Sequence, residues 1–403
     1  MRRAYKFRAY PTRPQEGRAI RLLADHCDLY NAALEERRDA WRLRQATITY
    51  GAQSAQLKQI RRGDRDGQGR HSFTAQQQTL RRLNAAFQAF YDRCRVGQQP
   101  GYPRFKPRIR FDQVMFVNGD GAKWRPATGN GWARASFQAV GAVKVRQHRP
   151  VRGTMKTLQL KREHRRWYVI VVAESEPVPV PPTGWEVGID LGVARFLTAS
   201  DGELIPNPGF LAAARGLIID LQRRQARARP ASGNRGRIRR RLARECRKIR
   251  NRRRDFHHKT ARALVNTCDA IWIERLRIRN MTRRPKPIPE LGRPGGYLPN
   301  GAAAKAGLNR SLLDAGWAQF TQILAGKAEE AGRRVIWVNP AGTSIGCHQC
   351  GRRCTRPRQD TVICPVHGPM DADVNGARNV FARAGLGSGQ ASRAAREAVG
   401  FSR

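Results

Sequence analysis

One stretch of the sequence places a carboxylate where an apolar strand tolerates it least. In residues 185–193 (WEVGIDLGV) the apolar side chains alternate onto one face, and Gly188, Asp190 and Gly192 share the other. A buried carboxylate is costly unless it is paired or binds a metal, and glycines beside it leave room for a backbone or a ligand. One interpretation is a metal-binding acid that faces a phosphate backbone. The other is a strand that ends at Asp190 with its carboxylate in water, and this stretch alone does not decide between them.

The charge of the chain favours a polyanionic partner. Among 403 residues, 77 Lys and Arg oppose 31 Asp and Glu, which gives a net charge of +46, while 40% of residues are hydrophobic. That apolar fraction predicts two or three folded domains rather than a disordered basic polymer, and the charge points to nucleic acid. An anionic membrane is the alternative, but we find no apolar run of about 18 residues, no signal-peptide core and no lipidation motif. We therefore expect no membrane binding and a location in the prokaryotic cytoplasm or on the nucleoid.

The N-terminal half predicts strands with a helical insertion. Residues 4–10 alternate aromatic and basic side chains as a strand does, and Thr12 with Gln15 predicts a capping box at the start of a helix. A second helix is expected from about 74 to 94, after a glycine-broken loop at 61–70. The later segments predict an antiparallel barrel or sandwich, with strands at 113–117, 139–145, 157–161 and 167–173.

Two basic stretches are candidates for nucleic-acid contact. In residues 102–108 (YPRFKPR), Tyr102, Arg104 and Lys106 could stack on bases and bind phosphates, or serve as aromatic staples and solvated cations at a domain edge. Residues 235–254 hold twelve Lys or Arg in twenty positions beside an apolar stripe. A helix so one-sided in charge repels itself unless phosphates neutralise it, so we favour nucleic-acid binding over a solvated face. The residues we single out there are Arg239, Arg240, Arg244, Arg247 and Arg250.

The second half begins after a proline-rich linker and has the pattern expected of a ribonuclease-H-like α/β domain. A strand carrying Asp190 is followed by a hairpin signal and then by a long helical region. A mobile loop, which in an enzyme could be a lid, is expected at 281–307. The remaining predictions are strands at 195–200, 203–205, 269–274 and 334–338, and helices within 210–266 and 312–331.

Four of the eight cysteines fall close together near the C-terminus. Cys347 and Cys350 form one CxxC knuckle, and Cys364 with His367 forms a CxxH knuckle, with thirteen residues between the two. This spacing is typical of a structural zinc ribbon with one Zn²⁺, in a reducing compartment. Cys354 could replace His367 as the fourth ligand or remain a free thiol.

Three acids of the second half stand at element ends. Asp190 and Glu274 end predicted strands, and Asp373 starts a predicted helix just after the knuckles. The purely structural role of Asp373 there would be an N-cap worth about 1 kcal/mol. Such carboxylates would repel one another unless divalent cations bind them. Two Mg²⁺ ions about 4 Å apart can drive phosphodiester cleavage, so the arrangement predicts a nuclease.

These motifs, in this order, resemble a known family. The series G-I-D-L-G at 188–192, I-E-x-L at 273–276, a zinc ribbon and D-x-D-x-N-G-A at 371–377 looks like the split RuvC nuclease domain of the TnpB family and of compact type V CRISPR effectors. The opening AYKFRAYPT, Gln15 and the YPRFK element match as well, so the resemblance spans nearly the whole chain. Two positions depart from it: His367 stands where a fourth cysteine is common, and Gly376 where TnpB proteins usually have alanine.

The resemblance implies an RNA-guided DNA endonuclease whose partners are a guide RNA and target double-stranded DNA, as a monomer or a homodimer on one guide RNA. Its catalytic acids would be Asp190, Glu274 and Asp373; Asp373 is preferred to Asp371 because it lies two residues before the motif asparagine. Base pairing would supply specificity, and the protein would read only a short flanking DNA motif. The domains implied are a wedge-like β-barrel over 1–14 and 96–176, a helical recognition insert over 15–95, a linker over 177–184, a RuvC domain over 185–342 and 371–384, a zinc ribbon that contacts target nucleic acid over 343–370 and a flexible tail over 385–403.

Three other functions use the same features. An RNA-guided protein that binds DNA without cutting would not need all three acids. A transposase or recombinase with a similar acidic site would work without a guide. A structural RNA-binding protein with a zinc ribbon would carry the three carboxylates by accident.

Overall fold

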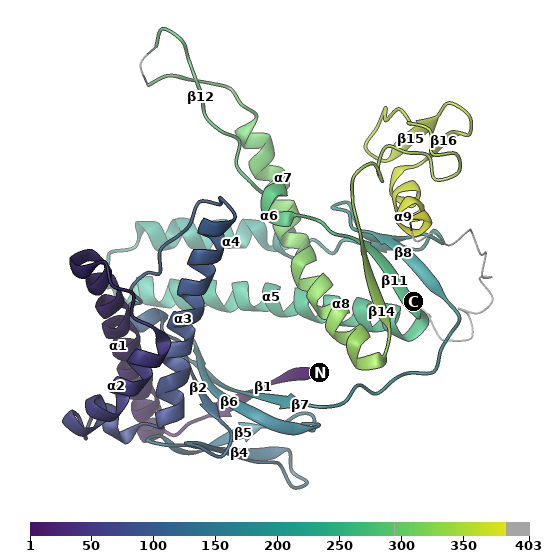
Figure 1. The fold of residues 1–403 in the computed structure, drawn as a ribbon. Coiled ribbons are helices and arrows are strands. Elements are labelled where there is room, and N and C mark those ends of the chain that lie inside the picture. Colours follow the sequence, from purple (N-terminus) through teal and green to yellow (C-terminus); the bar gives the residue numbers. More distant parts are fainter. Residues whose placement is uncertain (294, 384–403) are drawn as a thin grey trace. The chain divides into compact units, whose positions relative to one another are not determined.

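The computed structural model describes residues 1–293 and 295–383, and the chain divides into two compact units, Met1–Glu176 and Pro177–Arg403 (Figure 1). The expected flexible tail at 385–403 lies outside the described residues. Within the described part of the chain, no helix has the length and apolarity needed to span a membrane.

The first unit is built on one antiparallel sheet of seven strands, in the order β2-β6-β7-β1-β5-β4-β3. A bridge between Asn118, just after β2, and Ala122, the first residue of β3, brings the two edge strands together, so the sheet is nearly closed. The expected N-terminal strand is confirmed and lies inside this sheet, between β7 and β5. The strands are β1 (Arg2–Tyr10), β2 (Gln113–Val117), β3 (Ala122–Arg125), β4 (Trp132–Phe137), β5 (Gly141–Arg146), β6 (Thr154–Glu163) and β7 (Arg166–Glu174).

Strands β3 and β4 are not among the predicted strands. In β4 two of the three inward positions are held by Ala133 and Ala135, which are buried although alanine has a low strand propensity, and the third is Phe137. Strand propensity therefore gave no signal there, and cross-strand packing decides the structure. The predicted strands β2, β6 and β7, which carry Val, Leu or aromatic side chains on the buried face, were confirmed.

Helices of the first unit pack on the sheet through one hydrophobic core. Thr12 accepts a hydrogen bond from the backbone of Gln15, and the Gln15 side chain bonds back to Thr12, so the predicted capping box is confirmed. The predicted loop at 61–70 is wrong in its first residues, because a helix capped by Thr49 runs to Gly63. The helices are α1 (Arg13–Arg44), α2 (Tyr50–Gly63) and α3 (Phe73–Arg95), with short 3₁₀ turns at Gln68–Arg70 and Arg108–Arg110.

The second unit holds a mixed sheet of five strands, in the order β10-β9-β8-β11-β14. Strand β8 pairs in parallel with β11 and β11 with β14, whereas β9 runs antiparallel to β8 and forms the predicted hairpin with β10. The bounds are β8 (Glu186–Asp190), β9 (Arg195–Ala199), β10 (Leu204–Pro206), β11 (Ala270–Glu274) and β14 (Arg334–Val338).

Alternation along β8 gives the two faces of this sheet different neighbours. Val187 and Ile189 enter a core shared with helices α5 (Gly233–Thr267) and α8 (Trp317–Ala331). The other face, which carries Gly188 and Asp190, is covered by α9 (Ala372–Ala382), as Figure 1 shows. Helix α4 (Phe210–Arg227) completes the predicted helical region beside α5.

Two predictions around residues 281–331 need correction. The expected loop contains a two-stranded hairpin, β12 (Ile288–Pro289) with β13 (Tyr297–Leu298), and its last residues begin helix α7 (Ala302–Ala315). The alanine-rich start of α7 has high helix propensity but little amphipathic signal, which is why it was missed. The helix predicted over 312–331 is interrupted at Gly316, which has φ +69° and separates α7 from α8. The remaining elements are α6 (Ile278–Met281), β15 (Thr361–Cys364) and β16 (Gly368–Asp371).

Candidate functional site

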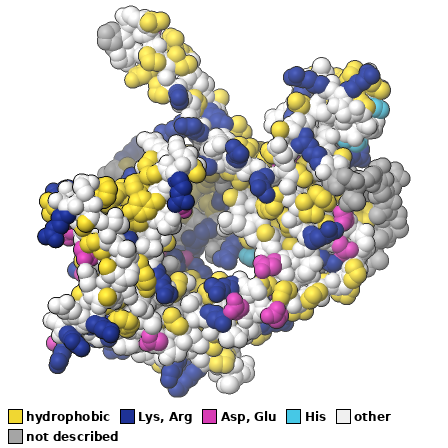
Figure 2. Space-filling model, in the orientation of Figure 1, with side chains coloured by type: hydrophobic (Ala, Val, Ile, Leu, Met, Phe, Trp, Pro, Cys, Tyr) yellow, Lys and Arg dark blue, Asp and Glu magenta, His cyan; other side chains and the backbone are white. Residues whose placement is uncertain are grey.

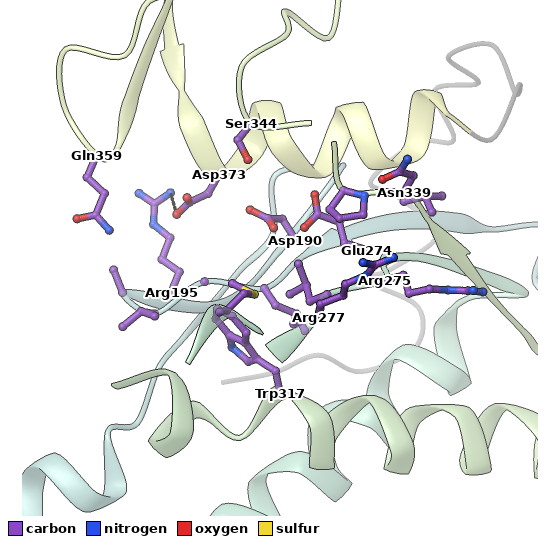
Figure 3. Close-up of a pocket in the computed structure, with 18 of the residues that line it drawn as sticks. Asp190, Arg195, Glu274, Arg275, Arg277, Trp317, Asn339, Ser344, Gln359 and Asp373 are labelled. Atoms are coloured by element: carbon purple, nitrogen blue, oxygen red, sulfur yellow. Dashed lines mark ion pairs between the residues drawn. The ribbon is translucent and has the colours of Figure 1, made fainter. Parts of the chain in front are cut away.

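The structure brings the three predicted acids of the second unit together. Ile189 of β8 pairs with Ile273 of the parallel strand β11, so Asp190 and Glu274, the next residues, end neighbouring strands at one edge of the sheet. Asp373 lies in the first turn of α9, the helix that covers β8. Figure 3 shows the Asp190 carboxylate between those of Asp373 and Glu274, at one side of a shared pocket.

The carboxylates disfavour one another's ionisation. Burial, together with the charges of Glu274 and Asp373, raises the pKa of Asp190 to about 7. Burial also raises the pKa of Glu274, and burial with the charge of Asp371 raises that of Asp373. A divalent cation between these oxygens would relieve both effects, and oxygen ligands of this kind are those that Mg²⁺ prefers. The donor set therefore fits Mg²⁺.

Asp371 has a different task from Asp373. Its Oδ1 accepts hydrogen bonds from the backbone N–H groups of Asp373 and Val374, each at 3.0 Å, so Asp371 is the N-cap of α9 and the capping role considered for Asp373 is wrong. Its Oδ2 accepts from Arg195 Nη1 at 2.6 Å. Burial acts to raise the pKa of Asp371, but these hydrogen bonds outweigh it and hold the pKa below its usual value. The Asp373 carboxylate is left facing the pocket.

The pocket beside the acids has a volume of about 1360 Å³. Its wall combines the carboxylates with guanidinium groups, a lining that suits a phosphodiester. Figure 3 shows Arg195 near Asp373, and Arg275 and Arg277 on the side of Glu274. The other basic and aromatic lining residues are Arg356, Trp317 and Trp337.

The four predicted knuckle ligands form a second cluster. One ligand atom from each of Cys347, Cys350, Cys364 and His367 lies within 4.8 Å of the others. The Cys347 and Cys364 sulfurs lie 3.5 and 3.6 Å from His367 Nδ1, and the Cys350 and Cys364 sulfurs are 3.6 Å apart. Ligands about 2.3 Å from a tetrahedral Zn²⁺ would stand roughly 3.7 Å apart, so the cluster fits zinc. Cys354 is not among these four, and its sulfur contacts the Arg352 carbonyl oxygen at 3.8 Å.

Sequence reasoning missed residues that hold the acids in place. Thr343, which is 1% exposed, donates its hydroxyl hydrogen bond to Glu274 Oε1, and Arg195 connects strand β9 with the start of α9. Two asparagines of α9, Asn375 and Asn379, bind the backbone that leads into the first cysteine knuckle. The only signal available was that Asn375 and Asn379 are four residues apart and so share a helix face.

The predicted nucleic-acid residues occupy different environments. Tyr102 packs its ring edge-on against Phe87 and Phe90, at centroid distances of 5.5 and 5.3 Å, although it is 41% exposed. Lys106 lies with Nζ 4.4 Å from the centroid of the Tyr30 ring, and Arg104 is exposed. On α5, Arg239, Arg240, Arg244 and Arg250 are exposed and Arg247 is partly so. Lys and Arg are also frequent over the visible face in Figure 2, and contact with nucleic acid stays a prediction for all eight residues.

The chain is similar to known proteins over most of its length. A family model described as a probable transposase matches residues 169–284, a Cas12f1-like TNB domain model matches 317–380 and a helix-turn-helix domain model matches 1–46, where the structure has β1 and α1. The putative RNA-guided DNA endonuclease InsQ of Escherichia coli (strain K12) is 30% identical over 94% of this chain and 91% of its own length. A putative RNA-guided DNA endonuclease of Streptomyces pristinaespiralis is 31% identical over 96% and 90%. The fold resembles that of a Cas12f1–sgRNA–target DNA complex, with a TM-score of 0.59 at 11% identity over 94% of this chain and 98% of that one.

Proposed function

This chain belongs to the TnpB family, and on that premise we propose that it is an RNA-guided DNA endonuclease. The observation that carries the proposal is the convergence of Asp190, Glu274 and Asp373 on one pocket, with the pKa of Asp190 raised first by burial and then by the charges of the other two acids. Three carboxylates in this arrangement are unfavourable for stability alone and are useful for binding metal.

The second unit is proposed to contain a RuvC-type nuclease domain. Numbered from β8, its sheet has the order 3-2-1-4-5 with the second strand antiparallel, which is the strand order of ribonuclease-H-like domains. The domain would comprise 185–342 and 371–384, interrupted by the zinc ribbon at 343–370. In the first unit, residues 1–14 and 96–176 would form the wedge-like barrel and 15–95 the recognition insert, with 177–184 as the linker.

Cleavage would take place at the carboxylates. Asp190, Glu274 and Asp373 would hold two Mg²⁺ ions, which supply an activated water and charge stabilisation for phosphodiester hydrolysis. Arg275 and Arg277, beside Glu274, would bind phosphates that flank the scissile bond and orient it against the acids. Arg195 would keep Asp371 neutralised, so that α9 presents Asp373 rather than Asp371 to the pocket.

The cysteine cluster would hold one structural Zn²⁺ through Cys347, Cys350, Cys364 and His367, and the ribbon around it would contact target nucleic acid. A guide RNA and target double-stranded DNA would bind over the basic surfaces of the chain, including Tyr102, Arg104 and Lys106 and the arginines of α5. The setting that suits these partners is the bacterial cytoplasm, and one chain or two could act on one guide RNA.

The test is cleavage by protein purified with the RNA it retains. That RNA is sequenced, and duplex DNA targets that match it are prepared with a library of flanking motifs. The protein is then incubated with these targets and Mg²⁺. Cutting by the wild type but not by Asp190→Asn is the expected result. Retained RNA with no cutting under any flanking motif would replace the proposal with guided DNA binding, and cutting without RNA would favour a guide-independent transposase.

A further inference from the structure

Glu274 is held by a residue outside the acidic motifs. Its side chain is 9% exposed, and its Oε1 accepts a hydrogen bond from the hydroxyl of Thr343. Thr343 lies in the segment that follows β14 and starts at Asn339. Its hydroxyl oxygen is also 2.8 Å from the Pro340 carbonyl oxygen. A buried hydroxyl with these neighbours fixes the rotamer of the carboxylate beside it. The position of the Thr343 turn therefore sets the position of Glu274.

Helix α9 holds that turn. Asn379 donates from Nδ2 to the carbonyl oxygen of Thr343 at 2.9 Å and to that of Gly346 at 2.7 Å. Asn375, one helical turn earlier and 1% exposed, donates to Gly346 at 2.8 Å. Its Oδ1 accepts from the backbone N–H of His348 at 2.9 Å. The amides thus tie the chain from Thr343 to the first cysteine knuckle onto one face of α9.

The same helix positions the other two acids. Its first turn carries Asp373, and its backbone lies directly on β8 at Gly188, two residues before Asp190. Gly376 faces the Asp190 carboxylate so closely that a Cβ there would be 3.2 Å from Oδ2. Asp190 and Asp373 are therefore placed by α9 itself, and Glu274 is placed by α9 through Asn379 and Thr343.

We propose that Asn379 and Thr343 are positioning residues that set Glu274 against Asp190 and Asp373 and thereby determine the affinity of the carboxylates for divalent metal. Asn379 and Asn375 also bind the backbone of Gly346, next to Cys347, so the segment that holds Glu274 leads directly into the first cysteine knuckle. Neither Thr343 nor Asn379 lines the pocket that the carboxylates face. The effect on cleavage rests on the proposed function, whereas the effect on metal binding can be measured without it.

The experiment is Mn²⁺ binding to the full-length protein, followed by electron paramagnetic resonance, with Asp190→Asn identifying the signal that belongs to the carboxylates. Thr343→Val removes the hydroxyl at nearly constant shape and should weaken binding about tenfold, as loss of a residue that orients a ligand commonly does. Thr343→Ser restores the hydroxyl and should bind within about twofold of the wild type, a difference that a general packing defect would not produce. Asn379→Ala should weaken binding about as much as Thr343→Val.

Two further variants make the test strict. Arg378→Ala removes bonds from the same helix to Ser200 and His348 without touching the Thr343 turn, and it should leave Mn²⁺ affinity close to the wild type. The double variant Asn379→Ala with Thr343→Val should bind no more weakly than the worse single variant, because both act through Glu274. If Asn379→Ala does not fold, the comparison of Mn²⁺ affinity between Thr343→Val and Thr343→Ser decides whether Thr343 is a positioning residue.

The outcomes separate this inference from the proposed function. Asp190-dependent Mn²⁺ binding that is unchanged in Thr343→Val, or equally weakened in Thr343→Ser, overturns the positioning role and leaves the proposed function standing. Additive losses in the double variant overturn it as well. Absence of Asp190-dependent binding in the wild type overturns both.

Discussion

Gly188 of β8 and Ala377 of α9 are in such close contact that a Cβ on Gly188 would stand 2.5 Å from the Ala377 carbonyl oxygen. The contact is between backbones, so no side chain can move aside to relieve it. It seats the helix that carries Asp373 on the strand that carries Asp190. Gly188, the first glycine of the G-I-D-L-G motif, is therefore required for packing of α9 on β8 rather than for access of a ligand.

We expect Gly188→Ala to reduce the free energy of unfolding of the second unit by about 1–3 kcal/mol, because α9 must move away from the sheet. Urea denaturation followed by tryptophan fluorescence measures the change. Gly216→Ala is the matched control, since Gly216 lies in α4 with open space around it and alanine there should stabilise the helix by about 0.5–1 kcal/mol. An equal effect of the two substitutions would contradict the packing account.

The raised pKa of Asp190 predicts how stability depends on pH in the metal-free protein. In the unfolded chain an aspartate titrates near pH 4, whereas Asp190 in the folded protein has a pKa of about 7. Between these values the folded state binds the extra proton, so this group's contribution to stability falls as pH rises from about 4 to 7. Thermal melts of the wild type and of Asp190→Asn should therefore diverge as pH rises, with Asp190→Asn the more stable at pH 8. Mg²⁺ should raise the wild-type melting temperature more at pH 8 than at pH 5, and a metal effect independent of pH would count against the shared acid site.

Arg195 is expected to act on cleavage through Asp371 and Asp373. Arg195→Gln removes the guanidinium that binds Asp371 Oδ2 at 2.6 Å. The negative charge of Asp371 beside Asp373 is then no longer neutralised. We expect kcat to fall about 10- to 100-fold with little change in KM for target DNA, which is the usual scale for residues that orient metal ligands. Arg195→Lys should recover part of the loss. A change confined to KM would instead place Arg195 in DNA binding.

The cysteine cluster gives a direct test of ligand identity. Metal analysis of purified protein should find one zinc per chain in the wild type and in Cys354→Ser, and less than one in Cys364→Ser and His367→Ala. The physical reason is that Cys347, Cys350, Cys364 and His367 already supply four ligand atoms within 4.8 Å. Loss of zinc in Cys354→Ser with retention in His367→Ala would assign the fourth ligand to Cys354.

The basic face of α5 should contribute to nucleic-acid affinity in a salt-dependent way. Replacing Arg239, Arg240 and Arg247 by glutamine should lower the slope of log K against log salt by up to about 2–3, since each phosphate contact contributes roughly 0.7–0.9. Fluorescence anisotropy with the retained RNA measures the slope. The control is the triple variant Arg2→Gln, Arg42→Gln and Arg95→Gln, whose side chains already pair with carboxylates and which changes the net charge equally. Equal slopes for the two triple variants would show a general charge effect.

Much of the second unit could be predicted because its strands carry strong local signals. The segments ending at Asp190, Glu274 and Val338 are apolar, β-branched and bounded by turns, so strand ends and the acids on them were readable from the sequence. The knuckle spacing likewise identified the four residues that the structure gathers. By contrast, α2 and the alanine-rich start of α7 lack an apolar stripe and were missed.

What could not be predicted depends on contacts between segments far apart in the chain. Thr343 meets Glu274 because β14 pairs with β11 and because the backbone after β14 is held by Asn379 of α9, 36 residues downstream of Thr343. Asp371, rather than Asp373, caps α9, and this assignment likewise depends on Arg195, which is 176 residues from Asp371. A motif of alternating acids shows that a site is present, but it does not show which acid caps the helix.

The central claim is that a bound RNA directs this protein to cut DNA at the Asp190 site. The most direct test is to rebuild the retained RNA with a new guide segment and to map cuts on a plasmid that contains matched and unmatched targets, with Mg²⁺ and an Asp190→Ala control. We predict that the cut moves to the sequence matched by the new guide and disappears in Asp190→Ala. A cut that stays in place when the guide is changed, or that persists in Asp190→Ala, would contradict the account.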